Sequence, residues 1–92
     1  MSRRLERRVR HDYTGSEADT VLELLDTLTL PFLDGMPEGT ERVQAAIVHV
    51  AAGDSGRLLA EAASAQQDWR DVLVAAGLAD EGWRDRLKAL LG

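Results

Sequence analysis

Apolar residues recur at helical spacing along most of this chain, and Gly, Pro or Asp separates one such segment from the next. Within residues 40–52, the i, i+3, i+4 and i+7 positions of one helix face are occupied by Val43, Ala46, Ile47 and Val50. With only 2 Trp, 1 Tyr and 1 Phe, the core must be mostly Leu, Val and Ala. Leu and Ala are strong helix formers. We therefore predict an all-α fold, a compact bundle of four or five short helices.

Capping residues and turns give the expected helix ends. Ser16 is predicted to cap the first helix, Asp54 to cap the third, and Gly53 to close the second. Two prolines and two glycines within residues 29–39 predict a loop, whose apolar residues should pack on the body. The helices are expected over residues 17–28, 40–52, 55–65, 69–76 and 81–91.

The phrase Trp-Arg-Asp-x-Leu occurs twice, once from Trp69 and again from Trp83. Asp68 precedes the first copy and Asp80 lies shortly before the second, so each copy has an acidic residue where a helix starts. In both copies the Trp lies four residues before a Leu, on the same helix face. We interpret the phrase as one way of starting a helix used twice. Both indoles should lie against the core, Trp69 the more buried and Trp83 the likelier to touch a partner.

The segments ERVQAAIVHVAAGD and DWRDVLVAAGLADEGW resemble a family of small bacterial helical proteins to which no activity is assigned. The resemblance covers about residues 40–91, and WRDVLVAAGLA is its most specific part. It implies a small stand-alone helical protein and no mechanism. The family pattern has an acidic residue where Gly82 stands, so the last helix is expected to start more loosely here.

Charge is distributed unevenly along the sequence. Five arginines and one glutamate give residues 1–10 a charge of +4, while the remaining six basic and fifteen acidic residues give −9. We predict a basic arm over residues 1–15, mobile or peripherally docked, followed by a single helical domain over residues 16–92. The candidate partner-contact residues are Arg3, Arg4, Arg7, Arg8 and Arg10 of the arm, together with Trp83.

The arm itself has two interpretations. Leu5 and Val9 are four residues apart, as on a helix face, whereas Val9, His11 and Tyr13 alternate as they would on a strand. Both alternatives remain open at the level of the sequence.

No residue pattern indicates catalysis or a cofactor. Cysteine is absent, which excludes disulfides, thiolate zinc sites and a Cys nucleophile. The two histidines, His11 and His49, lack the spacing of a metal site, and we expect them at the surface or its boundary. The GDSG at residues 53–56 joins two helical segments and is interpreted as a cap and turn. We expect no enzyme activity, no metal and no cofactor.

The remaining predictions concern partners and location. No apolar run approaches the roughly 20 residues of a membrane helix, and no secretory signal is present, so a cytoplasmic protein without membrane contact is expected. Residues 69–91 have the lengths of a helix-turn-helix, but Arg86 falls at a position expected to be buried. We therefore predict a non-enzymatic protein-interaction module, with homodimerisation as one form of it. The alternative is a small regulator that contacts nucleic acid through its Arg-rich arm.

Overall fold

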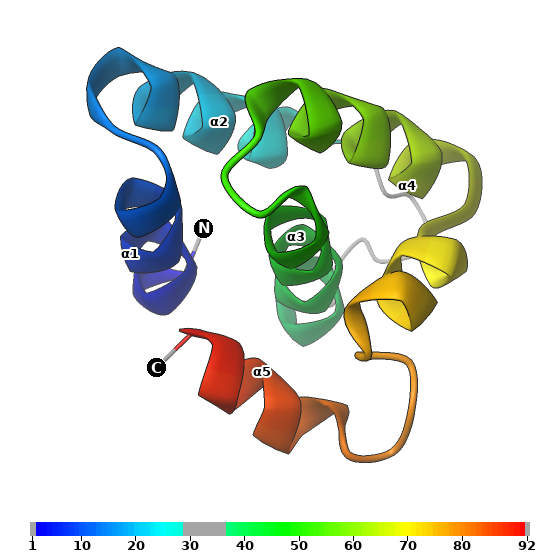
Figure 1. The fold of residues 1–92 in the computed structure, drawn as a ribbon. Helices are drawn as coiled ribbons and strands as arrows, with labels where there is room; N and C mark the ends of the chain where they lie inside the picture. The colour runs from blue at the N-terminus through cyan, green and yellow to red at the C-terminus, as the bar shows by residue number, and fades with distance from the viewer. Residues whose placement is uncertain (1, 29–36, 92) are drawn as a thin grey trace.

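The computed structural model describes residues 2–28 and 37–91 of this chain. Within these ranges the secondary structure consists of five α-helices (Figure 1). They are α1 (Arg3–Asp12), α2 (Gly15–Thr27), α3 (Pro37–Ala51), α4 (Ser55–Ala76) and α5 (Trp83–Leu91). The predicted all-α fold is confirmed. Most of the predicted loop at residues 29–39 lies outside the described residues, and its last three positions begin α3.

Helix α3 stands in the middle of the molecule, with α1 to one side, α2 and α4 across one end and α5 across the other (Figure 1). Its residues 43–48 are all buried, on every side of the helix, because α1, α4 and α5 all pack against it. One of these six is polar: Gln44 donates a hydrogen bond from Nε2 to the Leu25 carbonyl at 3.1 Å, which joins α3 to α2. The apolar face identified in the sequence, formed by Val43, Ala46, Ile47 and Val50, accounts for only part of this buried segment.

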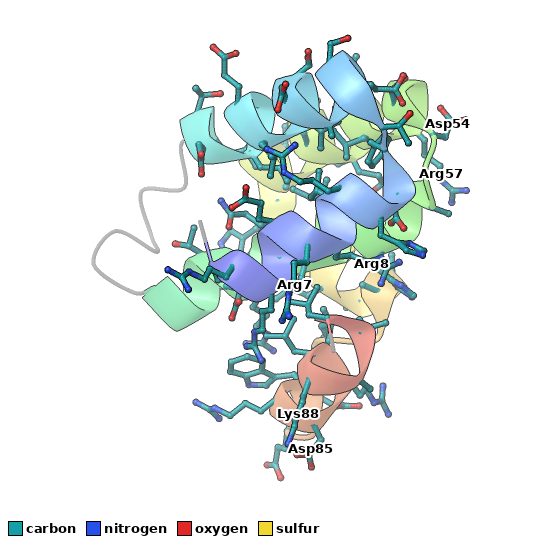
Figure 2. The ribbon with its side chains drawn as sticks, turned by 90° about the vertical axis from the view of Figure 1, so that its left-hand side faces the viewer. Arg7, Arg8, Asp54, Arg57, Asp85 and Lys88 are labelled. Carbon is teal, nitrogen blue, oxygen red and sulfur yellow. The ribbon has the colours of Figure 1, made fainter. Side chains whose placement is uncertain are left out.

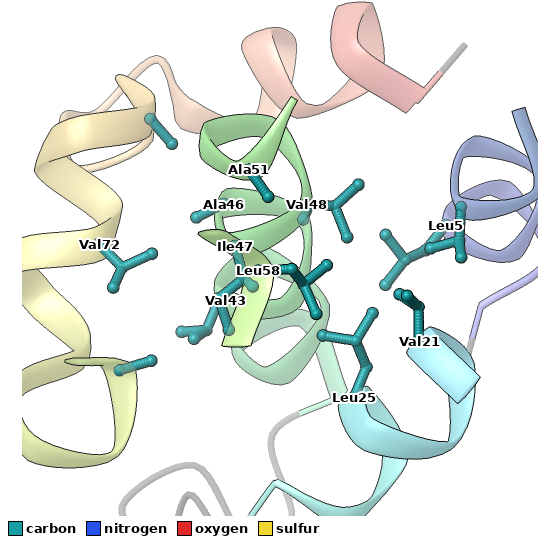
Figure 3. Packing of buried hydrophobic residues seen from close by; sticks show 14 of the residues in the cluster. Leu5, Val21, Leu25, Val43, Ala46, Ile47, Val48, Ala51, Leu58 and Val72 are labelled. Carbon is teal, nitrogen blue, oxygen red and sulfur yellow. The ribbon is translucent and has the colours of Figure 1, made fainter. Parts of the chain in front are cut away.

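The core consists mainly of Leu, Val and Ala, as predicted. Figure 3 shows side chains from four helices converging around Ile47, including Leu5 of α1, Leu25 of α2 and Leu58 of α4. A core of small and branched side chains lets neighbouring helices approach closely. The fold therefore depends on α1 as well as on the helices after residue 15.

The prediction of a mobile or peripheral arm is wrong for residues 3–13. They form α1 and the turn after it, and Leu5 and Val9 are 0 % exposed while Tyr13 is 1 % exposed. The Ser2 hydroxyl caps this helix by accepting the Leu5 backbone N–H at 3.3 Å. The helical alternative is correct. A four-residue spacing puts Leu5 and Val9 on one face of α1, and acidic residues of the domain pair with several of the arginines beside them.

The helix ends agree with the sequence in part. Gly53 follows α3 with φ of 84°, the left-handed geometry predicted for it. Asp54 caps α4 by accepting the Arg57 N–H at 3.1 Å, also as predicted. Ser16 is not the cap of α2: Thr14 occupies that position without a side-chain hydrogen bond, and the helix already includes Ser16.

In both copies of the repeated phrase, an aspartate just before it accepts a backbone N–H two positions on. The helices predicted on either side of Asp68 form a single α4 with a kink, since Asp68 has φ of −150° and ψ of 95°. Its carboxylate accepts the N–H of the residue two positions on, Arg70, at 3.1 Å. The carboxylate of Asp80 accepts the Gly82 N–H at 3.1 Å in the same way, although α5 begins only at Trp83. A local capping device therefore explains the phrase.

Candidate interaction surface between α1 and α5

Helices α1 and α5 are in contact although they stand at opposite ends of the sequence, and the C-terminal end of α5 approaches α1 (Figure 1). Arg4 lies beside the first turn of α5, where it lines a hollow with Trp83. One turn further along α1, Arg8 donates a hydrogen bond from Nη1 to the Leu90 carbonyl at 2.9 Å. Side chains of the two helices therefore meet along a shared seam.

The start of α1 is fixed to α3 by the carboxylate of Glu41. Arg4 donates to its two oxygens from Nε at 2.9 Å and from Nη2 at 2.7 Å, and the Ser2 hydroxyl donates to it as well. The hydrogen bonds from Arg4 lower the pKa of Glu41 below its ordinary value of 4.5, against the opposing effect of partial burial. A bidentate pair of this kind fixes both position and orientation. Its role is therefore to hold α1 in place.

We predict that Glu41→Gln lowers the free energy of unfolding by about 1–2 kcal/mol near pH 7, because a charge-assisted hydrogen bond is lost at a half-buried position. The lowered pKa means that the ionised carboxylate stabilises the fold above about pH 4.5, and that this contribution disappears as the pH falls through the folded-state pKa. The difference between the two proteins should therefore shrink below pH 4.5 in urea titrations. Glu23→Gln, at an exposed position of α2, is the control. A difference of the same size at acid pH would contradict this account.

Three of the five arm arginines serve the fold. Besides Arg4, Arg8 pairs with Asp12 at 2.9 Å, and Arg10 pairs with Glu6 and Asp19, both at 3.3 Å. The carboxylates that pair with these arginines reduce the electrostatic repulsion among the five arginines of α1.

Arg3 and Arg7 differ from these three. Both are exposed on α1, and neither makes a hydrogen bond or ion pair within the described part of the chain. The candidate contact residues therefore divide into three that hold the helix and two that remain available at its surface.

Trp83 lies at one end of the seam, half-buried and packed against the core cluster. The guanidinium carbons of Arg42 and Arg84 lie 4.5 and 4.4 Å from its ring centroid. Arg42 is itself held by donating from Nε to the Leu78 carbonyl at 2.8 Å. Partial burial lowers the pKa of Arg42, and the neighbouring charge of Arg84 acts in the same direction. The indole is thus a fixed element of the surface and not a freely rotating one.

Both tryptophans pack against the core, as predicted. Trp69 is half-buried rather than fully buried, with the guanidinium of Arg70 5.5 Å from its ring centroid. Since Trp83 is also half-buried, the expected order of burial stays a prediction.

Two hollows follow each other along the seam. The first has a volume of about 270 Å³ and is lined by Arg4, Glu41, Trp83, Arg84, Asp85, Leu87 and Lys88. The second has a volume of about 390 Å³ and is lined by Arg7, Arg8, His11, Ala89, Leu90 and Leu91. We call the two together the α1–α5 groove.

The α1–α5 groove combines an apolar floor with a cationic rim. Leu87 and Leu91 are buried in its floor and Leu90 is half-buried there. Arg7 and Lys88 are exposed on either side of it, on one face of the molecule (Figure 2). Neither makes an ion pair or hydrogen bond with any described residue. The groove can therefore offer unneutralised positive charge beside an apolar surface.

Sequence reasoning missed Lys88, Leu90 and His11 as members of this surface. Residue type alone gave no signal for them, because a single lysine near the end of a helix is ordinary dipole compensation. Their spacing from one another, and from the arginines of α1, becomes meaningful only once α5 is known to lie beside α1.

The histidines and carboxylates do not form a metal centre in the part of the chain that the structure describes. No group of three or more His, Asp or Glu side chains there is arranged to hold a metal ion. His11 is exposed with Nδ1 3.1 Å from Asp12, and His49 is half-buried in α3 with no hydrogen-bond partner for its Nδ1. These are the surface and boundary positions predicted for them.

Comparison with protein-family models, with curated proteins and with solved structures gave no match for this chain. Across residues 2–28 and 37–91, no helix combines the length and apolar character required to cross a membrane. The fold and the surface together define an all-α domain with a groove between its first and last helices.

Proposed function

We propose that this domain is a non-enzymatic protein-interaction module of the cytoplasm that contacts its partner through the α1–α5 groove. The observation that carries the proposal is the convergence of Arg4 and Trp83, 79 residues apart in sequence, on one hollow beside Lys88, whose side chain has no ion pair among the described residues. Protein contact surfaces favour an aromatic anchor and arginine next to apolar side chains. The proposed surface has all three.

A regulator that binds nucleic acid through α1 is the alternative function. It is supported by the side chains of Arg3 and Arg7, which are exposed and have no ion pair within residues 2–28 and 37–91. Binding to phosphates draws most of its affinity from many cation–phosphate contacts, and each contact contributes about 0.9 to the salt dependence of the binding constant on a logarithmic scale. With Arg4, Arg8 and Arg10 engaged inside the domain, few contacts remain. This alternative is therefore less favoured than a protein partner, whether that partner is another protein or a second copy.

Partner capture with a matched pair of charge reversals tests the proposal. Arg7→Glu places a negative charge on the rim of the groove, whereas Arg57→Glu makes the same change at an exposed position at the start of α4, away from α5 (Figure 2). We expect immobilised wild-type protein and Arg57→Glu to retain the same proteins from an extract of the native host, and Arg7→Glu to lose them. Both variants should keep the melting temperature of the wild type within a few degrees, since neither side chain is packed.

Two outcomes would contradict the proposal. One is that Arg7→Glu retains the same proteins as the wild type. The other is that the retained material is nucleic acid, released by salt and lost on Arg3→Glu, which would establish the alternative. Sedimentation at several protein concentrations identifies the case in which the partner is a second copy.

A further inference from the structure

The arginines of α1 that line the two hollows are one helical turn apart. Arg4 lines the first hollow and Arg8 the second, and they are four residues apart on α1. At 1.5 Å per residue the backbones of these two arginines are about 6 Å apart along α1, one helical turn. Side chains at positions i and i+4 of an approaching helix are also about 5–6 Å apart. One apolar side chain of such a helix would enter each hollow.

The side chains that line the groove indicate the charge of the helix that would bind there. Its floor includes Leu87, Leu90 and Leu91. Its exposed rim carries the cations Arg7, Arg84 and Lys88 against one exposed carboxylate, that of Asp85, so the rim is cationic on balance. A complementary surface has apolar side chains in its centre and carboxylates at its edges. The net charge of −5 does not oppose this, because at physiological salt charges more than about 8 Å away are largely screened and the local cations dominate.

On these grounds we infer that the α1–α5 groove receives an acidic amphipathic helix of a protein partner, with two apolar side chains one turn apart in the two hollows and carboxylates against Arg7 and Lys88. The inference rests on the proposed function and specifies the kind of partner. Helix-in-groove recognition of this type uses apolar anchors at helical spacing.

A second copy of this chain fits the groove poorly. Its most acidic helix, α2, buries Val21 and Leu25 in its own core, and its other leucines, Leu22 and Leu24, are half-buried and pack against that core. Among the described residues the large apolar side chains that are exposed are Leu59 and Val74, at 59 % and 67 %. They are fifteen residues apart, on either side of the kink in α4, and cannot enter two hollows one turn apart.

A nucleic acid strand also fits less well than an acidic helix. The groove offers few cations for phosphate contacts, because Arg4 is paired with Glu41 and Arg8 with Asp12. The floor of the groove is aliphatic, and the half-buried Trp83 already has two guanidinium groups over its ring, which limits stacking by a base.

Synthetic peptides test the inference on the full chain. The probe is an Ala-based peptide of about 15 residues, long enough to form a helix, with two Leu four residues apart and Glu beside them. One control peptide has Lys in place of Glu, and a second has Ser in place of the two Leu. Binding is measured by backbone amide NMR shifts, which locate the contact, and by titration of tryptophan fluorescence.

We expect the Glu peptide to bind saturably, with shifts confined to α1 and α5, and the two control peptides to bind at least about tenfold more weakly. The double variant Arg7→Glu, Lys88→Glu should lower the affinity for the Glu peptide by a similar factor, because two attractive contacts become repulsive. Arg57→Glu should leave it unchanged. Equal binding of the Glu and Lys peptides, shifts outside α1 and α5, or displacement of the Glu peptide by a DNA duplex of about 20 base pairs would overturn the inference.

The test separates this inference from the proposed function. If the Glu peptide does not bind while Arg7→Glu still abolishes capture of proteins from the host extract, the groove is a protein-binding surface for another kind of partner and only the inference fails. If the peptide does not bind and Arg7→Glu changes no capture, both fail together.

Discussion

Removal of residues 1–12 is expected to abolish cooperative unfolding of the domain. The deletion takes Leu5 and Val9, each 0 % exposed, out of the core and exposes the apolar surface that they cover on α2 and α3. Truncating one fully buried aliphatic side chain typically costs about 2–5 kcal/mol. A domain of this size has about 5–15 kcal/mol in total. The truncated chain should therefore show no sigmoidal transition in thermal unfolding followed by circular dichroism.

The single substitution Leu5→Ala provides the same test if the truncated chain aggregates. It should lower the free energy of unfolding by about 2–5 kcal/mol in urea titrations. The control is Arg3→Gln with Arg7→Gln, which alters two exposed side chains of the same helix and should change stability by no more than about 0.5 kcal/mol each. Were the truncated chain to melt cooperatively within a few degrees of the full chain, α1 would be an accessory helix and not part of the core.

Ile47→Ala is expected to be among the most destabilising single substitutions outside α1. Ile47 is 0 % exposed at the centre of α3, the helix against which three others pack, so its neighbours have little freedom to close the resulting cavity. We expect a loss of about 2–5 kcal/mol for Ile47→Ala and about 0.5–1.5 kcal/mol for Ile47→Val.

Equilibrium urea unfolding measures this loss, with Leu59→Ala as the control at an exposed aliphatic position. The control should shift stability by no more than about 0.5 kcal/mol. A similar small effect for Ile47→Ala would mean that α3 does not form the centre of the core.

Some of the positions at which helices begin and end were predictable because their causes are local. The carboxylate of Asp54 accepts the backbone N–H of the residue three positions on, and the carboxylates of Asp68 and Asp80 each accept the N–H of the residue two positions on. Gly53 supplies left-handed geometry within its own turn. Such interactions depend on neighbours in sequence and on no other part of the fold. For the same reason, the residues around the repeated Trp-Arg-Asp phrase were enough to identify it as a capping arrangement.

The candidate surface was predictable only as separate residues. Arg4, Arg7, Arg8 and Trp83 stood out by charge and by the rarity of tryptophan, but nothing in their spacing indicated that they share a groove. Lys88 was not identified at all. The pairing of α1 with α5 brings them together, and it depends on the hydrogen bond from Arg8 to the Leu90 carbonyl across 82 positions of sequence.

Sequence pattern was sufficient to establish that the chain is helical, where α4 starts and about where the helices after residue 15 end, and that the core is aliphatic, because period and capping act over one or two turns. Whether residues 3–12 join the core was settled by tertiary contacts. Leu5 and Val9 make an amphipathic face in any helix, but that face becomes buried only when other helices supply an apolar surface, and when Glu41 and Asp19 accept the arginines beside it. These partners lie elsewhere in the sequence, and the free energy of docking depends on all of them at once.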